Sequence, residues 1–298
     1  MGCAALKVLM ELGVEVPAVF THRDDPGENT WFSSLAKLSA ANGIPVYFPE
    51  NINDSRWVGL LKELEPDILL SCYFRQMIGQ EVLDIPRIAA VNLHGSLLPK
   101  YRGRCPVNWQ LVHGEKQSGV TLHHMVLQAD AGDIVGQKAV EVADTDTAVD
   151  LYAKLETAAV DVLREYIPML LDGTAPRMEQ DHSQATYFGG RRPEDGKIDW
   201  SWDARRICNL VRAVAWPYPG AFFEKDGQRI MVWESEPVDQ DSDCAPGTVL
   251  SVDGDGALVR AGQGAVLLKV VSHEGGDPQT SVDPRNLFIQ GQLLQNQD

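Results

Sequence analysis

Residues 67–94, DILLSCYFRQMIGQEVLDIPRIAAVNLH, contain two apolar runs separated by a mixed segment. Asp67–Tyr73 is almost continuously apolar, and Ala89–His94 is a second run of the same kind. Continuous apolar runs of this length are typical of strands that are buried on both faces of a sheet. The stretch therefore predicts two interior strands of an α/β domain.

The segments before residue 67 alternate between helical and strand-like patterns. We expect helices over 4–12, 31–41 and 55–64, with Asn53 as the N-cap of the third, and strands over 15–21 and 44–48. This alternation predicts a doubly wound, mostly parallel, Rossmann-like sheet. Such folds usually open with a strand, whereas this chain opens with a helical pattern. We favour a first strand missing from this sequence, by truncation or a late start site, over a fold that begins with a helix.

The second half of the chain predicts a strand over 134–142 and a long helix that ends near Leu171, before Gly173 and Pro176. Residues 177–203 are irregular and polar, and we interpret them as a linker. Short strands with Asp-Gly turns follow, and they predict a small β-barrel-like (OB-like) domain over 204–298. The first domain would then cover residues 1–176.

The composition argues against several classes of protein. The 298 residues carry a formal net charge of −16, whereas nucleic-acid binders normally present a basic surface, so we expect no nucleic-acid partner. No apolar run reaches the roughly 18 residues of a membrane helix, and no secretory signal opens the chain. The 5 cysteines are scattered without a CxxC pair. This cysteine pattern predicts reduced thiols in a cytoplasmic protein.

Asn92 and His94 lie two residues apart at the end of the second apolar run. Side chains two apart in a strand share a face, and doubly wound folds place their sites at the C-terminal strand ends. An Asn amide can donate to an oxyanion, and a His can move a proton. Asp130 and Asp133 follow around a glycine in QADAGDIV, and a carboxylate beside a His raises the pKa of that His. Without a Ser or Cys nucleophile in the motif, these residues suggest direct attack of an amine on a carbonyl.

The spacing by itself leaves a structural interpretation open, because a strand-end His is often a satisfied structural residue and Asn92 could form a turn. His113, His123 and His124 have no partner pattern, and we expect structural roles for them. The pair His123-His124 lacks metal-ligand spacing, so we expect no metal site.

A resemblance to a known family favours the catalytic interpretation of Asn92 and His94 over the structural one. NLHGSLLPKYRGRCPVNW (92–109), followed by GVTLHHMVLQADAGDIV (119–135), resembles the 10-formyltetrahydrofolate-dependent formyltransferase family. FGGRRPEDGKIDWSWDARRICNLVRAVAWPYPGAF (188–222) is similar to the same family, and the resemblance covers essentially the whole chain. It implies that Asn92 stabilises the oxyanion, that His94 transfers the proton and that Asp130 raises the pKa of His94. The folate contacts it implies are Gln76, Met77, Ile78, Arg104, Val126, Leu127, Gln128 and Ala129.

The acceptor amine divides the family into two branches, which act on methionyl-tRNA or on nucleotide-linked amino sugars. The loop THRDDPGENTWF (21–32) and the segment EPVDQDSDCAPG (236–247) are acidic, which fits tRNA poorly. FTHRDDPGE (20–28) and GIPVYFPENIN (43–53) resemble the branch that formylates UDP-4-amino-4-deoxy-L-arabinose for lipid A modification. We therefore expect a nucleotide-sugar acceptor, with methionyl-tRNA as the alternative.

Overall fold

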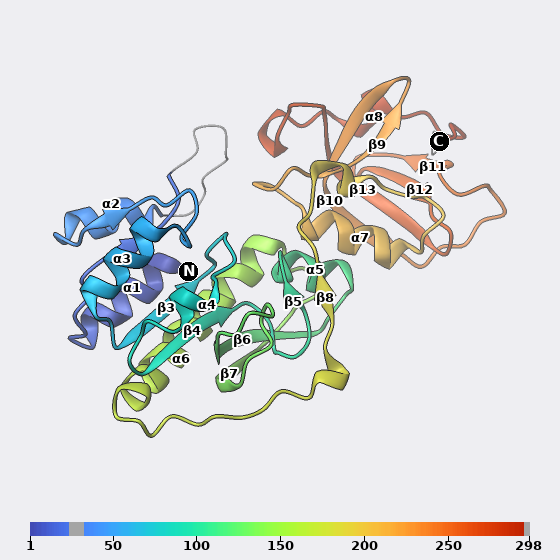
Figure 1. Cartoon of the computed structure of the whole chain (residues 1–298). Coiled ribbons are helices and arrows are strands. Elements are labelled where there is room, and N and C mark those ends of the chain that lie inside the picture. Colours follow the sequence, from blue (N-terminus) through green and yellow to red (C-terminus); the bar gives the residue numbers. More distant parts are fainter. Residues whose placement is uncertain (24–32, 295–298) are drawn as a thin grey trace. The chain divides into compact units, whose positions relative to one another are not determined.

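The computed structural model describes residues 1–23 and 33–294 (Figure 1). The chain divides into two compact units. Unit 1 comprises Met1–Pro106, Gln117–Glu141 and Tyr152–Gly189, and unit 2 comprises Val107–Lys116, Val142–Leu151 and Gly190–Asp298. Most of the acidic loop expected over 21–32 lies outside the described residues.

The main sheet of unit 1 has the strand order β3–β4–β6–β7, with β3 (Ile68–Cys72), β4 (Ala89–His94), β6 (Gln117–His124) and β7 (Ile134–Glu141). β3 pairs with β4 in parallel, whereas β4 with β6 and β6 with β7 are antiparallel. The predicted α/β class is confirmed, and the sheet is mixed. β4 is almost wholly buried, as its apolar run predicts. β3 is mostly half-buried, because it lies at an edge of this sheet.

A separate parallel pair and several helices complete unit 1. The pair consists of β1 (Val19–Phe20) and β2 (Val46–Tyr47), which are shorter than the strands expected over 15–21 and 44–48. The helices are α1 (Gly2–Glu11), α2 (Leu35–Ala41), α3 (Ser55–Leu64), α4 (Gln80–Leu83) and α6 (Ala148–Leu171), the last of which begins in unit 2. The N-cap of α3 is Asp54 and not Asn53, because the Asn53 side chain bonds the backbone of residues 77 and 79 instead.

The apolar face of α3 contributes to a core cluster that consists of Ile52, Val58, Leu61 and Val82. Half-buried residues packed against this cluster include Leu69 of β3. Burial of a Val, Leu or Ile side chain contributes roughly 1.5–3 kcal/mol to folding. The cluster therefore fixes the positions of α3, α4 and β3, and with them the loop that follows β3.

Unit 2 contains a five-stranded antiparallel sheet of order β11–β12–β13–β10–β9. Its strands are β9 (Ala221–Lys225), β10 (Gln228–Val238), β11 (Val249–Val252), β12 (Ala257–Arg260) and β13 (Ala265–His273). α7 (Ala204–Ala213) begins at the N-cap Asp203 and packs its buried face against β10. The unit also holds α5 (Pro106–Val112), η2 (Pro193–Gly196), η3 (Pro278–Thr280) and α8 (Pro284–Leu287). The described part of the chain has no helix long and apolar enough to cross a bilayer.

The segment expected to be a linker, 177–203, is divided between the two units. Residues 177–189 belong to unit 1 and residues 190–203 to unit 2. The first part contains η1 (His182–Gln184) and β8 (Tyr187–Phe188), which pairs in parallel with β5 (Arg102–Gly103). Residues 177–189 are thus built into the unit that carries Asn92 and His94.

Candidate active site

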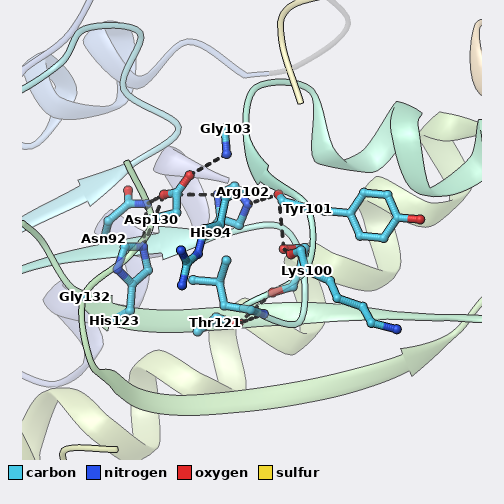
Figure 2. A network of polar contacts seen from close by, with 12 residues as sticks. Asn92, His94, Lys100, Tyr101, Arg102, Gly103, Thr121, His123, Asp130 and Gly132 are labelled. Carbon is cyan, nitrogen blue, oxygen red and sulfur yellow. Dashed lines mark hydrogen bonds and ion pairs between the residues drawn. The ribbon is translucent and has the colours of Figure 1, made fainter. Parts of the chain in front are cut away.

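The three residues that the sequence motifs indicate lie close together: Asn92 and His94 are both near the carboxylate of Asp130 (Figure 2). β4 supplies Asn92 and His94, and the loop between β6 and β7 supplies Asp130. Asp130 Oδ1 lies 3.3 Å from Asn92 Nδ2 and 3.5 Å from His94 Nδ1. The His94 side chain is buried and Asn92 is half-buried, so ring and amide are both held against the sheet.

His123 is a fourth member of this group that sequence reasoning assigned to a structural role. Its Nε2 lies 3.4 Å from Asp130 Oδ1 and 3.2 Å from Asn92 Nδ2, and the residue is 1% exposed. The antiparallel register places His123 directly across from Asn92. We call Asn92, His94, His123 and Asp130 the Asp130 cluster. The sequence pattern predicted mostly parallel pairing and so did not reveal this neighbour.

The loop that follows β4 surrounds the cluster with backbone groups. His94 Nε2 lies 2.8 Å from the carbonyl oxygen of Tyr101, and the Gly103 N–H donates to Asp130 Oδ2 at 2.8 Å (Figure 2). Thr121 Oγ1 donates to the Ser96 carbonyl at 2.6 Å and so fixes the start of this loop. Both oxygens of the Asp130 carboxylate are therefore held, and both nitrogens of His94 face oxygen atoms.

The backbone around Asp130 is unusual, because Asp130 has a φ of +54° in the left-handed region. Two residues later, a Cβ on Gly132 would clash with the carbonyl oxygen of His124. Glycine at 132 lets the chain turn tightly enough to aim Asp130 at β4.

We predict that Gly132→Ala lowers the free energy of unfolding by about 2 kcal/mol or more, because the clash is with backbone and cannot be relieved by a rotamer change. Chemical denaturation measures this effect. Gly59→Ala is the control: Gly59 lies in α3 with open space around its Cβ, so this change should stabilise by about 0.5–1 kcal/mol. Equal stability of Gly132→Ala and the wild type would contradict the packing argument.

Burial and hydrogen bonding set the charges in the cluster. Burial alone would raise the pKa of Asp130, but the hydrogen bond with His123, the nearby His94 and the Gly103 N–H lower it to about 2. Burial lowers the pKa of His94 below its usual value, although Asp130 and the Tyr101 carbonyl oppose this shift. The influence of Asp130 on the pKa of His94 thus has the predicted sign, but desolvation of the ring outweighs it. A neutral His94 beside an ionised Asp130 is suited to accept a proton.

Comparison with known proteins identifies the family. Residues 8–167 match the family model described as "Formyl transferase", and residues 191–287 match "Formyl transferase, C-terminal domain". This chain belongs to the formyl transferase family. The family resemblance of the sequence motifs is confirmed.

Solved structures of similar fold include a sugar 3N-formyl transferase and an N-formyltransferase. WlaRD, a sugar 3N-formyl transferase solved with dTDP and 5-N-formyl-THF, is 20% identical, with a TM-score of 0.71 over 92% of this chain and 94% of that one. The N-formyltransferase of Helicobacter canadensis, in complex with folinic acid and dTDP-3-aminofucose, is 20% identical, with a TM-score of 0.70 over 90% and 94%. HypX of Aquifex aeolicus with tetrahydrofolic acid is 18% identical, with a TM-score of 0.61 over 91% and 46%. At these identities the likeness shows a shared fold.

The side chains expected to contact a formyl-carrying folate fall into two groups in this formyltransferase. Gln76 and Ile78 are half-buried and make contacts within the chain. The Gln76 amide accepts from the Ile52 N–H at 2.7 Å and donates to the Pro49 carbonyl at 2.8 Å, and Ile78 packs on the core cluster. These contacts give both side chains a structural role.

The second group is open to solvent. Met77, Val126 and Leu127 are 61%, 45% and 58% exposed, which is unusual for apolar side chains. Arg104 and Gln128 are also exposed, and Ala129 is half-buried. The exposed apolar side chains lie on the loops after β3 and β6, where they are accessible to a ligand. Within residues 1–23 and 33–294, no group of three or more His, Cys, Asp or Glu side chains is arranged to hold a metal ion.

Proposed function

We propose that this chain transfers a formyl group from 10-formyltetrahydrofolate to the primary amine of a nucleotide-linked amino sugar. The observation that carries the proposal is the Asp130 cluster, in which an amide donor, a neutral imidazole and a carboxylate converge without a nucleophilic Ser or Cys. Such a set suits direct acyl transfer between two amines. Because the chain belongs to the formyl transferase family, the acyl group in this proposal is a formyl group.

Each member of the cluster has a role in this reaction. The folate supplies the activated formyl carbon. His94 accepts the proton that the acceptor amine loses as its nitrogen bonds that carbon, and returns a proton to the folate nitrogen as the old carbon–nitrogen bond breaks. The Asn92 amide nitrogen lies near Asp130 Oδ1 and His123 Nε2, and its role is to donate to the oxygen on which negative charge develops. Asp130 stabilises the protonated form of His94 and orients its ring.

Two observations support a sugar acceptor. Solved structures of this fold include a sugar 3N-formyl transferase with dTDP and an N-formyltransferase in complex with dTDP-3-aminofucose. The formal charge of −16 is unfavourable for binding tRNA, which needs cationic side chains at its phosphates. The resemblance of residues 20–28 and 43–53 to the lipid A branch makes UDP-4-amino-4-deoxy-L-arabinose the first sugar to test. Methionyl-tRNA remains the alternative acceptor.

The acceptor can be assigned by offering the purified protein 10-formyltetrahydrofolate with each amine separately. UDP-4-amino-4-deoxy-L-arabinose, dTDP-3-aminofucose and methionyl-tRNA form the panel, and mass spectrometry identifies the formylated product. We expect formylation of a nucleotide sugar, with the UDP sugar giving the larger kcat/KM of the two. Formylation of methionyl-tRNA alone would overturn the sugar assignment, and preference for the dTDP sugar would overturn the choice of base and sugar.

A further inference from the structure

A buried arginine lies beside the Asp130 cluster and bonds a segment that neither family model covers. The two models match 8–167 and 191–287, so residues 168–190 fall between them. Arg102 is 1% exposed and Gln180 is 3% exposed. The guanidinium donates to Gln180 Oε1 from Nη2 at 2.6 Å and from Nε at 3.2 Å. Both donors reach the same oxygen, so this contact fixes the position of Gln180 Oε1.

Gln180 in turn holds the backbone that carries Asp130. Its Nε2 donates to the Asp130 carbonyl at 2.9 Å and to the Gly132 carbonyl at 2.6 Å. Both amide hydrogens and the amide oxygen are thereby used, so the side chain has one permitted orientation. The two carbonyls flank the turn in which Asp130 adopts its φ of +54°. Gln180 therefore stabilises the backbone conformation that aims the carboxylate at His94.

Arg102 is also connected by hydrogen bonds to the 126–129 loop, which we expect to bind folate. Arg102 Nη1 donates to the Tyr187 hydroxyl at 2.6 Å, and Gln128 Nε2 donates to the same oxygen at 2.6 Å. Backbone pairing of β5 with β8 sets Tyr187 opposite Arg102. We call Arg102, Gln180, Tyr187 and Gln128 the Arg102 cluster.

The partners of the Arg102 guanidinium within the described residues are Gln180, Tyr187 and the Nδ1 atom of His182 at 3.1 Å, and none of them is a carboxylate. A buried charge without a carboxylate partner is costly to desolvate, so it is a poor means of stabilising a fold. Its rigid fork of donors is instead well suited to fix two acceptors at once. Of the two acceptors that Arg102 fixes, Gln180 bonds the backbone of Asp130, and Tyr187 accepts from Gln128.

We propose that Arg102 and Gln180 are positioning residues for Asp130, and that Tyr187 positions the 126–129 loop for the formyl donor. The segment 177–188 is then a part of the active site and not a linker. This inference rests on the proposed function. It makes two separable predictions, because the Gln180 branch acts on the reacting groups and the Tyr187 branch acts on donor binding.

The Gln180 branch is tested by Gln180→Met, with Gln184→Met as the control because Gln184 is an exposed glutamine of the same segment. We expect Gln180→Met to lower kcat roughly 10- to 100-fold, as a small displacement of a catalytic group does, and Gln184→Met to match the wild type. In the Asp130→Asn background, Gln180→Met should add no more than about a threefold further loss, because it acts through Asp130. Losses that multiply would show a structural effect unrelated to Asp130 and would overturn the proposal.

A readout that does not need turnover accompanies these rates. Nuclear magnetic resonance titration of the His94 ring should give a lower pKa in folded Gln180→Met than in the wild type, because a displaced Asp130 raises it less. If Gln180→Met does not fold, Gln180→Glu keeps the contact to Arg102 while removing the donors to residues 130 and 132. Wild-type kcat and an unchanged His94 titration in a folded variant would refute the positioning role. Failure of the wild type to formylate any amine would instead refute the proposed function.

Tyr187→Phe removes only the hydroxyl that bridges Arg102 and Gln128. We expect the KM for the formyl donor to rise roughly fivefold, in line with the loss of the hydrogen bond from Gln128, while kcat changes less than about twofold. Steady-state kinetics with the donor as the varied substrate measures both constants. An unchanged KM, or a loss confined to kcat, would contradict the role given to Tyr187.

Discussion

Replacement of His94 with glutamine is expected to lower kcat by about 10³-fold or more. His94 is the imidazole that takes up and returns the proton in the proposed reaction, and general acid–base catalysis contributes roughly 10²–10⁴-fold to rates. Glutamine is suited to this test because its amide can still donate to the Tyr101 carbonyl, which His94 Nε2 approaches to 2.8 Å. Loss of activity would then reflect the missing proton transfer and not a collapsed loop.

His273→Gln provides the matched control, because His273 is an exposed histidine in unit 2. This variant should keep the wild-type kcat and the wild-type melting temperature. Initial rates of product formation at saturating donor and acceptor give the comparison. A kcat for His94→Gln within about tenfold of the wild type would remove His94 from the reaction.

Replacement of Asp130 with asparagine is expected to lower kcat about 10²-fold and to move the acidic limb of the pH–rate profile to lower pH. Asp130 raises the pKa of His94 against the larger effect of burial, so its removal lets the pKa of His94 fall further. The neutral imidazole that accepts the proton then persists to lower pH. Rates measured across the acidic range for both proteins check the direction of the shift.

Asp67→Asn is the control for this variant, since Asp67 is an exposed carboxylate whose ion pair with Arg87 contributes little to stability or rate. Its profile should overlay that of the wild type. An acidic limb that moves to higher pH in Asp130→Asn would contradict the electrostatic role of Asp130.

The same variant also makes a prediction about stability. The pKa of Asp130 is lowered from 3.8 to about 2, so the carboxylate stabilises the folded state above pH 3.8, and this contribution is lost as the pH falls through about 2. The shift corresponds to about 2 kcal/mol. Unfolding free energies of the wild type and Asp130→Asn should therefore converge as the pH falls below 3.8. A difference that stays constant over this range would mean that the native contacts do not favour the ionised form.

The sequence predicted the α/β class, and it predicted that Asn92, His94 and Asp130 form one active site. Strand periodicity places Asn92 and His94 on one face, and a continuous apolar run predicts a strand as buried as β4. The link to Asp130 required the family motif, because nothing in its local spacing indicates which strand end it approaches. Helical periodicity likewise located α1, α2, α3 and α6, although the cap of α3 was misplaced by one residue.

The remaining features depend on tertiary contacts that have no local pattern. His123 joins the cluster through antiparallel pairing of β4 with β6, a pairing that the alternation of strands and helices does not specify. Gln180 and Tyr187 lie in an irregular polar segment, and their role depends on hydrogen bonds to residues distant in the sequence, including Arg102. The net pKa shift of His94 depends on its burial, which the sequence could not quantify.

The central claim, that the formyl group passes from folate to an amine through the Asp130 cluster, can be tested most directly by following the formyl carbon. 10-Formyltetrahydrofolate labelled with a stable carbon isotope in the formyl group is mixed with the protein and UDP-4-amino-4-deoxy-L-arabinose, and the products are followed by nuclear magnetic resonance. The account predicts that the label appears in a formamide on the sugar amine, in amounts equal to the tetrahydrofolate released, and that His94→Gln abolishes its appearance. Label that appears as free formate, or as sugar formamide at the same rate with His94→Gln, would contradict the account.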